Sequence, residues 1–215
     1  MFENIMSEER HSILEQLTRQ SLLQSFYMAG GTAAALYLGH RYSEDLDFFT
    51  QQEFDPFQLA HKMGDMEGFV LTGQEPGTLH CFVKNVKVSF LYYPYPFLEQ
   101  GMMYKNCMLA SLTDIALMKM VALVQRGARK DFTDLYFLDK EKISFEEILS
   151  LYPAKYSVKT YQPLVLIKSL GYFADAEREE MPKMFRMVSW EDIKNYFLRR
   201  QKELAVKIIN EKQNE

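Results

Sequence analysis

Residues 26–49, FYMAGGTAAALYLGHRYSEDLDFF, constrain the fold of this chain more than any other stretch. A short apolar run at 26–29 leads into Gly30-Gly31-Thr32, which reads as a tight turn, and a short helix rich in Ala and Leu follows. Residues 45–49, Asp-Leu-Asp-Phe-Phe, then read as a β-strand. The stretch therefore predicts a strand, a turn, a helix and a second strand in succession.

The second strand of this stretch brings two carboxylates together. Successive side chains of a strand point to opposite faces, so Asp45 and Asp47 share one face while Leu46 and Phe48 point to the core. Two close like charges are costly unless a raised pKa or a bound cation neutralises them. Mg²⁺ commonly binds one or two carboxylates together with substrate phosphate oxygens. We therefore expect Asp45 and Asp47 to hold Mg²⁺, or Mn²⁺ in its place.

The glycines of the turn supply the other half of the expected site. Because Gly30 and Gly31 have no Cβ, a phosphate can approach the backbone, and the N-terminus of the following helix offers free N–H groups. Thr32 is expected either to cap that helix or to hydrogen-bond a phosphate oxygen. Arg41 is expected to brace a carboxylate or a phosphate, or to form a structural ion pair. These features predict a nucleotide site beside the two acids.

These motifs, in this order, resemble the signature of the polymerase-β-like nucleotidyltransferase superfamily, in particular the bacterial AbiEii/AbiGii toxin family. The downstream half of the signature is similar to residues 114–138, DIALMKMVALVQRGARKDFTDLYFL. That segment has a helix with Lys119, followed by a Lys-Asp-x-x-Asp-Leu motif that contains Asp131 and Asp134. The resemblance extends over residues 26–138.

The resemblance implies a Mg²⁺-dependent enzyme that moves a nucleoside monophosphate from an NTP to an acceptor hydroxyl and releases pyrophosphate. It implies that Lys119 contacts the triphosphate or the transition state, and that Asp131 or Asp134 is a further acid. The acceptor would be an RNA or tRNA end or a protein, and the protein would be the toxin of a toxin–antitoxin or phage-defence system with a cognate antitoxin. The nucleotide-binding residues would be Gly30, Gly31, Thr32, Arg41, Ser43 and Arg126.

Residue 89 departs from the superfamily pattern. A third carboxylate usually lies within a Val-Lys-Val-Asp run on a neighbouring strand, whereas residues 86–90 here are Val-Lys-Val-Ser-Phe. Serine is neutral and a poor metal ligand. The third acid therefore comes from elsewhere, with Asp131 or Asp134 as replacement, or the metal site is weaker, or catalysis is lost. The alternative function is a catalytically impaired relative that binds a nucleotide or a protein.

The remaining pattern predicts an α+β fold: a polymerase-β-like mixed sheet with flanking helices, followed by a helical C-terminal lobe. We expect a nucleotidyltransferase core lobe at 1–110 and a helical lobe at 111–215 that contributes Lys119 and Asp131 or Asp134 to the cleft. Helices are predicted from apolar spacing, caps and Pro at 7–25, 55–62, 112–125 and from 144 onward. Strands are predicted at 69–72, 79–83 and 86–93, the last two joined by a Lys84-Asn85 hairpin.

The aromatic run Tyr-Tyr-Pro-Tyr-Pro-Phe at 92–97 breaks regular structure and leaves two interpretations open. In one, it is a buried connection whose rings seal the two lobes. In the other, it is a stacking surface for a nucleobase. Met102 and Met103 are expected to fill gaps in the core.

Charge and composition exclude several classes of protein. The net charge of −4 and pI near 5.7 argue against a protein that coats nucleic acid by bulk electrostatics. No apolar run approaches eighteen residues, and the acidic, polar N-terminus does not resemble a secretory signal. Two cysteines are too few for a disulfide framework. We expect a cytoplasmic protein with no membrane partner.

Overall fold

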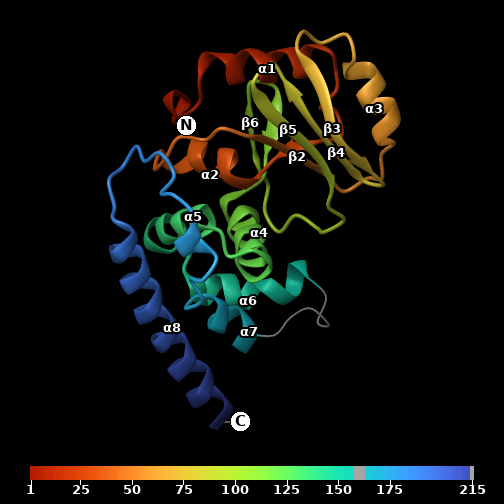
Figure 1. Cartoon of the computed structure of the whole chain (residues 1–215). Helices are drawn as coiled ribbons and strands as arrows, with labels where there is room; N and C mark the ends of the chain where they lie inside the picture. The colour runs from red at the N-terminus through yellow and green to blue at the C-terminus, as the bar shows by residue number, and fades with distance from the viewer. Residues whose placement is uncertain (157–162, 214–215) are drawn as a thin grey trace. The chain divides into compact units, whose positions relative to one another are not determined.

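The computed structural model describes residues 1–156 and 163–213, and it divides the chain into two compact units, Met1–Ser111 and Leu112–Glu215 (Figure 1). Each unit is described by itself. Residues 157–162 and 214–215, which belong to the predicted helical lobe, lie outside the described residues.

The first unit is built on a mixed sheet of seven strands in the order β3-β4-β5-β2-β1-β7-β6. β2 pairs with β5 in parallel and β1 pairs with β7 in parallel, while the other neighbours are antiparallel. The mixed sheet confirms the predicted fold class. The strands are β1 (Tyr27–Met28), β2 (Leu46–Thr50), β3 (Phe69–Glu75), β4 (Thr78–Val83), β5 (Val86–Tyr92), β6 (Met102–Tyr104) and β7 (Cys107–Leu109).

The side chains on one face of this sheet form part of the hydrophobic core of the unit. Phe48 of β2 and Phe90 of β5 are fully buried and stacked, with ring centroids 5.3 Å apart, and Phe26 meets Phe90 edge to face at 5.1 Å. Burying one such side chain stabilises a fold by roughly 1.5–3 kcal/mol. Period-two alternation then places the neighbouring residues of β2, including Asp47, on the opposite face.

Four helical segments accompany the sheet: η1 (Glu3–Ile5), α1 (Glu8–Arg19), α2 (Gly30–Leu38) and α3 (Pro56–Met63). Asp55 caps α3 by accepting hydrogen bonds from two backbone N–H groups, as the Asp-Pro start predicts. The prediction that the first helix extends to residue 25 is wrong. α1 ends at Arg19 because Ser21 adopts a left-handed backbone with φ of +58°. Leu22 and Leu23 are buried from a turn instead, which imitates helical spacing.

Two hairpins of the sheet have the same dipeptide at the turn. Lys84-Asn85 joins β4 to β5, as predicted, and Lys105-Asn106 joins β6 to β7, which the sequence analysis did not predict. The expectation that Met102 and Met103 fill core gaps is wrong, because both lie on the edge strand β6 with more than half of their surface exposed.

The aromatic run at 92–97 packs its rings on residues of β1 and β2. Phe97 lies edge to face with Tyr27 at a centroid distance of 4.6 Å, and Tyr93 meets Phe49 in the same way at 5.7 Å. Tyr27 and Phe49 are themselves stacked at 6.0 Å and paired across β1 and β2. The run is therefore an aromatic layer of the first unit.

The second unit is helical, as predicted. α4 and α5 pack together, α4 also contacts α6 and α7, and α8 packs against α5 and α7. Phe132 of α5 is fully buried and contacts the rings of Phe173, Trp190 and Phe197. The predicted capping box of Ser144 and Glu147 is confirmed. The helices are α4 (Leu112–Gln125), α5 (Arg129–Glu141), α6 (Phe145–Lys155), α7 (Pro163–Ser169), η2 (Ala176–Arg178) and α8 (Trp190–Gln213).

Among the helices that the structure describes, none combines the length and apolar character that a membrane span requires.

Candidate active site

Asp47 is the second residue of β2, and Asp45 directly precedes this strand, which begins at Leu46 rather than at the predicted residue 45. Leu46 and Phe48, between and after them, are fully buried, whereas both aspartates are only partly covered. The predicted alternation of burial is therefore confirmed over residues 45–48, and that the two carboxylates converge on one site stays a prediction.

Gly30 faces the carboxylate of Asp47. A Cβ built on Gly30 would lie 3.3 Å from Asp47 Oδ2, and the backbone of Gly30 has a left-handed φ of +67°. The N–H of Ala29 donates to the Asp47 carbonyl at 3.2 Å. The two glycines are the first residues of α2 rather than a turn before it, which corrects the predicted helix start. The N-terminus of α2 is thus fixed against Asp47.

Thr32 ties α2 to the segment that carries Asp45. Its hydroxyl donates to the Asp45 carbonyl and lies 2.7 Å from Ser43 Oγ, and both side chains are buried. Thr32 does not cap the helix, because the N-cap position is Ala29 and has no side-chain hydrogen bond. Of the two predicted roles, the cap is therefore wrong. The observed contacts make Thr32 and Ser43 positioning residues for Asp45.

Arg41 brings a positive charge to the N-terminus of α2. Its side chain is buried, and Nη1 donates to the Tyr42 carbonyl at 3.0 Å. A Cβ on Gly31 would lie only 2.2 Å from Arg41 Nη2, so the guanidinium occupies space that a side chain at residue 31 would fill. The second glycine of the motif is needed for this close approach.

Ser89 lies directly across from Asp47 on the neighbouring strand β5. The two residues pair in the parallel register of β2 and β5, and Ser89 is 2% exposed. Paired residues of adjacent strands point to the same face at a spacing of about 4.8 Å, so residue 89 is where a third acid would join the pair. Among residues 1–156 and 163–213, no three acidic, His or Cys side chains form a group that could hold a metal.

Lys119, Asp131 and Asp134 meet inside the second unit. Lys119 Nζ lies 2.9 Å from Asp131 Oδ1 and 2.6 Å from Asp134 Oδ2, and each of the three side chains is at least 96% buried. Arg126 joins them, since its Nε donates to Asp131 Oδ2 at 2.8 Å and its Nη2 to Asp131 Oδ1 at 3.0 Å. Lys119 of α4 and Arg126, the residue directly after α4, therefore contact the same carboxylate.

The electrostatics of this network favour ionised carboxylates. Burial alone would raise the pKa of Asp131, but the charges of Lys119 and Arg126 outweigh it and hold that pKa below its usual value. The positive charges of Lys119, which is buried, and of Arg126, which is half exposed, balance the two buried carboxylates in formal charge, which makes the burial of those carboxylates tolerable.

A second buried ion pair was not anticipated from the sequence. Lys155 Nζ at the end of α6 lies 2.7 Å from Asp114 Oδ1 at the start of α4, and both side chains are almost fully buried. In the sequence, Asp114 is the acid of a Ser-x-x-Asp pattern at residues 111–114, which is typical of a helix start. Because Lys155 is 41 residues further on, no local motif links the two.

The carboxylates of the first unit fit a hard divalent cation. Asp45 and Asp47 offer oxygen donors on one face, and the missing Cβ of Gly30 leaves room beside Asp47 Oδ2. Within the second unit, the predicted site residues Arg126 and Asp134 gather around Lys119 and Asp131.

A protein-family model matches most of the chain. The model, described as nucleotidyl transferase AbiEii toxin, type IV TA system, aligns with residues 12–73 and 91–206. It covers both stretches on which the predicted resemblance rests, so that prediction is confirmed. Residues 74–90, which contain Ser89, lie outside the match.

Three individual proteins are similar to this chain in sequence or in fold. The uncharacterized protein aq_aa25 of Aquifex aeolicus (strain VF5) is 36% identical over 203 residues, which is 92% of this chain and 97% of that protein. JHP933 from Helicobacter pylori is similar in structure, with a TM-score of 0.54, 19% identity and 97% of each chain covered. The nucleotidyltransferase toxin MenT4 of Mycobacterium tuberculosis H37Rv has a TM-score of 0.56 at 12% identity, covering 89% of this chain and 83% of that chain. These two structures share the fold.

Proposed function

The chain belongs to the AbiEii family of nucleotidyltransferase toxins, and from this premise we propose that it moves a nucleoside monophosphate from an NTP to an acceptor hydroxyl with the help of Mg²⁺ or Mn²⁺. The observation that carries the proposal is the contact of Gly30 with Asp47, beside Asp45 on the same face. It combines a metal-binding pair with a backbone that a phosphate can approach.

Each residue of the first unit has a proposed task in this reaction. Asp45 and Asp47 would hold the metal ion, which supplies charge neutralisation at the phosphates when it is bound. The N–H groups at the N-terminus of α2 would receive the β- and γ-phosphates, because a helix N-terminus favours anions. Arg41, packed against Gly31, adds positive charge at this end. Thr32 and Ser43 hold Asp45 in place.

The residues of the second unit are proposed to complete the site. Lys119 would offset negative charge that accumulates on the triphosphate, and Arg126 would assist it. Asp131 or Asp134 would supply the further acid, either as a metal ligand or as the group that accepts the acceptor's proton. This assignment is supported by the mutual contact of these four side chains and by their place within the residues that the family model matches.

We further propose a biological setting that fits the family. The acceptor would be an RNA or tRNA end, or a protein, and the chain would act in the cytoplasm with a cognate antitoxin. Incubation with each α-labelled NTP, Mg²⁺ or Mn²⁺, and total RNA tests this proposal. A labelled RNA or protein band supports it and identifies the acceptor class. Absence of label with all four NTPs and both metals contradicts it.

A second candidate function is a catalytically impaired relative that binds a nucleotide or a protein. Ser89 favours it, because a neutral, buried residue stands beside Asp47 where a third acid would lie. This alternative predicts metal-dependent NTP binding without transfer. Transfer by the unmodified chain excludes it.

A further inference from the structure

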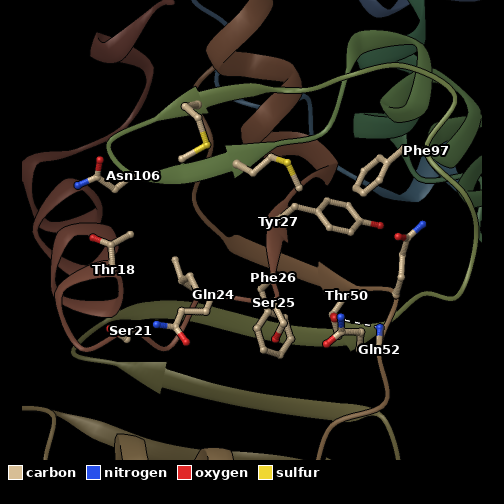
Figure 2. A pocket seen from close by; sticks show the side chains of 14 residues that line it. Thr18, Ser21, Gln24, Ser25, Phe26, Tyr27, Thr50, Gln52, Phe97 and Asn106 are labelled. Carbon is tan, nitrogen blue, oxygen red and sulfur yellow. Dashed lines mark hydrogen bonds between the residues drawn. The ribbon is translucent and has the colours of Figure 1, made fainter.

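A pocket in the first unit lies outside the residues used so far. Its volume is about 500 Å³, and it lies between the end of α1, the start of β1, the end of β2 and the β6–β7 hairpin (Figure 2). This volume is within the range of pockets that hold small organic molecules. The residues that line it include Gln24, Tyr27, Gln52, Phe97, Met103 and Met108.

The lining of the pocket selects against charged ligands. None of the fourteen described residues that line it has a charged side chain. The rings of Phe97 and of the buried Tyr27, packed edge to face on one another, contribute aromatic atoms to the lining, and Met103 and Met108 contribute flexible apolar side chains. Gln24 and Gln52 each offer an amide with both donors and an acceptor. This combination fits an uncharged planar ring with a hydrogen-bonding edge, which is the chemistry of a nucleobase.

The part of the pocket that Tyr27, Met108 and Met103 line is one row of side chains beyond Asp47, on the same face of the sheet. Phe49 follows Asp47 by two residues and pairs with Tyr27, and Tyr27 pairs with Met108, which pairs with Met103. Paired residues share a face, and two residues along a strand span about 7 Å. Tyr27 of the pocket is therefore in the row next to Asp47.

Asp47 separates this pocket from the N-terminus of α2. Gly30 contacts the Asp47 carboxylate, and Thr32 bonds to the backbone of Asp45, so α2 begins at the Asp45 end of β2. Thr50 and Gln52, at the other end of β2, line the pocket. Phosphates at α2 and a base in the pocket would lie on opposite sides of the acids.

We propose that this pocket binds the base of the acceptor nucleoside, an inference that rests on the proposed function. In phosphoryl transfer the attacking and leaving oxygens are roughly in line. The acceptor oxygen forms a bond to the α-phosphorus, the bond from the α-phosphorus to the bridging oxygen breaks, and pyrophosphate leaves with the electron pair. The hydroxyl proton passes to a carboxylate or to water. With pyrophosphate leaving on the α2 side, the acceptor enters from the pocket side.

The test uses uncharged nucleosides and an isosteric charge change. Adenosine, cytidine, guanosine and uridine are titrated into the full chain without metal or NTP, and binding is followed by ligand-observed NMR. The pocket variant is Gln24→Glu/Gln52→Glu. The matched control is Gln58→Glu/Gln100→Glu, which makes the same chemical change at two exposed residues of the same unit outside the pocket. Mg²⁺-ATP binding is measured separately on all three proteins.

We expect at least one nucleoside to saturate, and the pocket variant to weaken that binding about tenfold, or ~1.4 kcal/mol, while the control leaves it unchanged. Mg²⁺-ATP affinity should be the same in all three proteins. Failure of every nucleoside to saturate, or equal binding by the pocket variant and the control, overturns the inference. If ATP displaces the nucleoside and the pocket variant weakens ATP binding, the base belongs to the donor and the acceptor assignment is wrong. Labelled transfer to RNA tests the proposed function independently of these outcomes.

Discussion

The backbone of Gly30 lies close to the carboxylate of Asp47, because Gly30 has no side chain: a Cβ on residue 30 would lie 3.3 Å from Asp47 Oδ2. This contact joins the start of α2 to the acid pair of β2.

Gly30→Ala should impair nucleotide binding beyond its effect on stability. Gly30 has φ of +67°, and a left-handed backbone costs an L-residue roughly 1–2 kcal/mol. Gly127→Ala is the control, because Gly127 has φ of +54° but an added Cβ meets only ordinary contacts at 3.5 Å or more. Both variants should lose similar stability in thermal unfolding. Only Gly30→Ala should weaken Mg²⁺-NTP binding, and equal binding by the two would contradict the phosphate role of this turn.

Ser89→Asp should make the first unit dependent on metal. A carboxylate at this buried position beside Asp47 should cost roughly 1–3 kcal/mol without a cation. Added Mn²⁺ or Mg²⁺ should restore stability, because a ligand that binds the native state stabilises it. Ser89→Asn is the control, because Asn is similar in size to Asp but neutral. Its melting temperature should not change when Mn²⁺ or Mg²⁺ is added. If the melting temperature of Ser89→Asp does not change when either metal is added, a cation does not bind beside Asp47.

Asp131→Asn should destabilise the second unit by about 3–5 kcal/mol, since it removes one carboxylate from a buried ionic network. Arg126→Gln should cost about 1 kcal/mol or less, because the Arg126 side chain is 54% exposed. Denaturant unfolding followed by fluorescence of Trp190, the single tryptophan, reports on this unit. Equal costs for the two variants would contradict the buried network.

The contribution of the Asp131 ion pairs to stability should also decrease at low pH. The pKa of Asp131 in the folded chain is below its usual value, because Lys119 and Arg126 outweigh the effect of burial. Its contribution to stability is therefore fully present above the usual carboxyl pKa of about 3.9 and is lost as pH falls through the lowered value. The stability difference between the unmodified chain and Asp131→Asn should shrink over that range. A difference that is constant from pH 7 to pH 2 would contradict the ion pairs.

Local patterns predicted the parts of the fold that depend on neighbouring residues. The alternation of Asp45, Leu46, Asp47 and Phe48 predicted the face of the acid pair, and Lys84-Asn85 predicted a hairpin. The same dipeptide at Lys105-Asn106, between two short apolar runs, was an available signal for β6 and β7. It was missed because Met102 and Met103 have no strand preference as strong as that of Val or Ile.

Features that depend on distant residues were not predictable in this way. Thr32 looked like a helix cap, but its hydroxyl bonds to the backbone of Asp45, thirteen residues away. Lys155 and Asp114 pair only because α6 folds back on α4. The pocket beside Tyr27 combines residues from five segments between residues 18 and 108, so no single motif describes it. The Thr32 hydrogen bond, the Lys155–Asp114 ion pair and the pocket all depend on tertiary packing.

Asp47→Asn should leave the fold intact, because the variant keeps the shape of the side chain and removes one of two like charges. Thermal stability without metal should hold or rise. Asp65→Asn is the control, since Asp65 is exposed in the same unit. Unfolding of Asp47→Asn alone would mean that Asp47 is held by a structural ion pair rather than reserved for a metal.

The most direct measurement is transfer of labelled nucleoside monophosphate from an α-labelled NTP to RNA by the unmodified chain, Asp47→Asn and Asp65→Asn. We predict metal-dependent labelling by the unmodified chain and by Asp65→Asn, and a loss of more than about 100-fold in Asp47→Asn. Equal labelling by Asp47→Asn and Asp65→Asn would contradict the central claim that the Asp45 and Asp47 carboxylates beside Gly30 form the catalytic metal site.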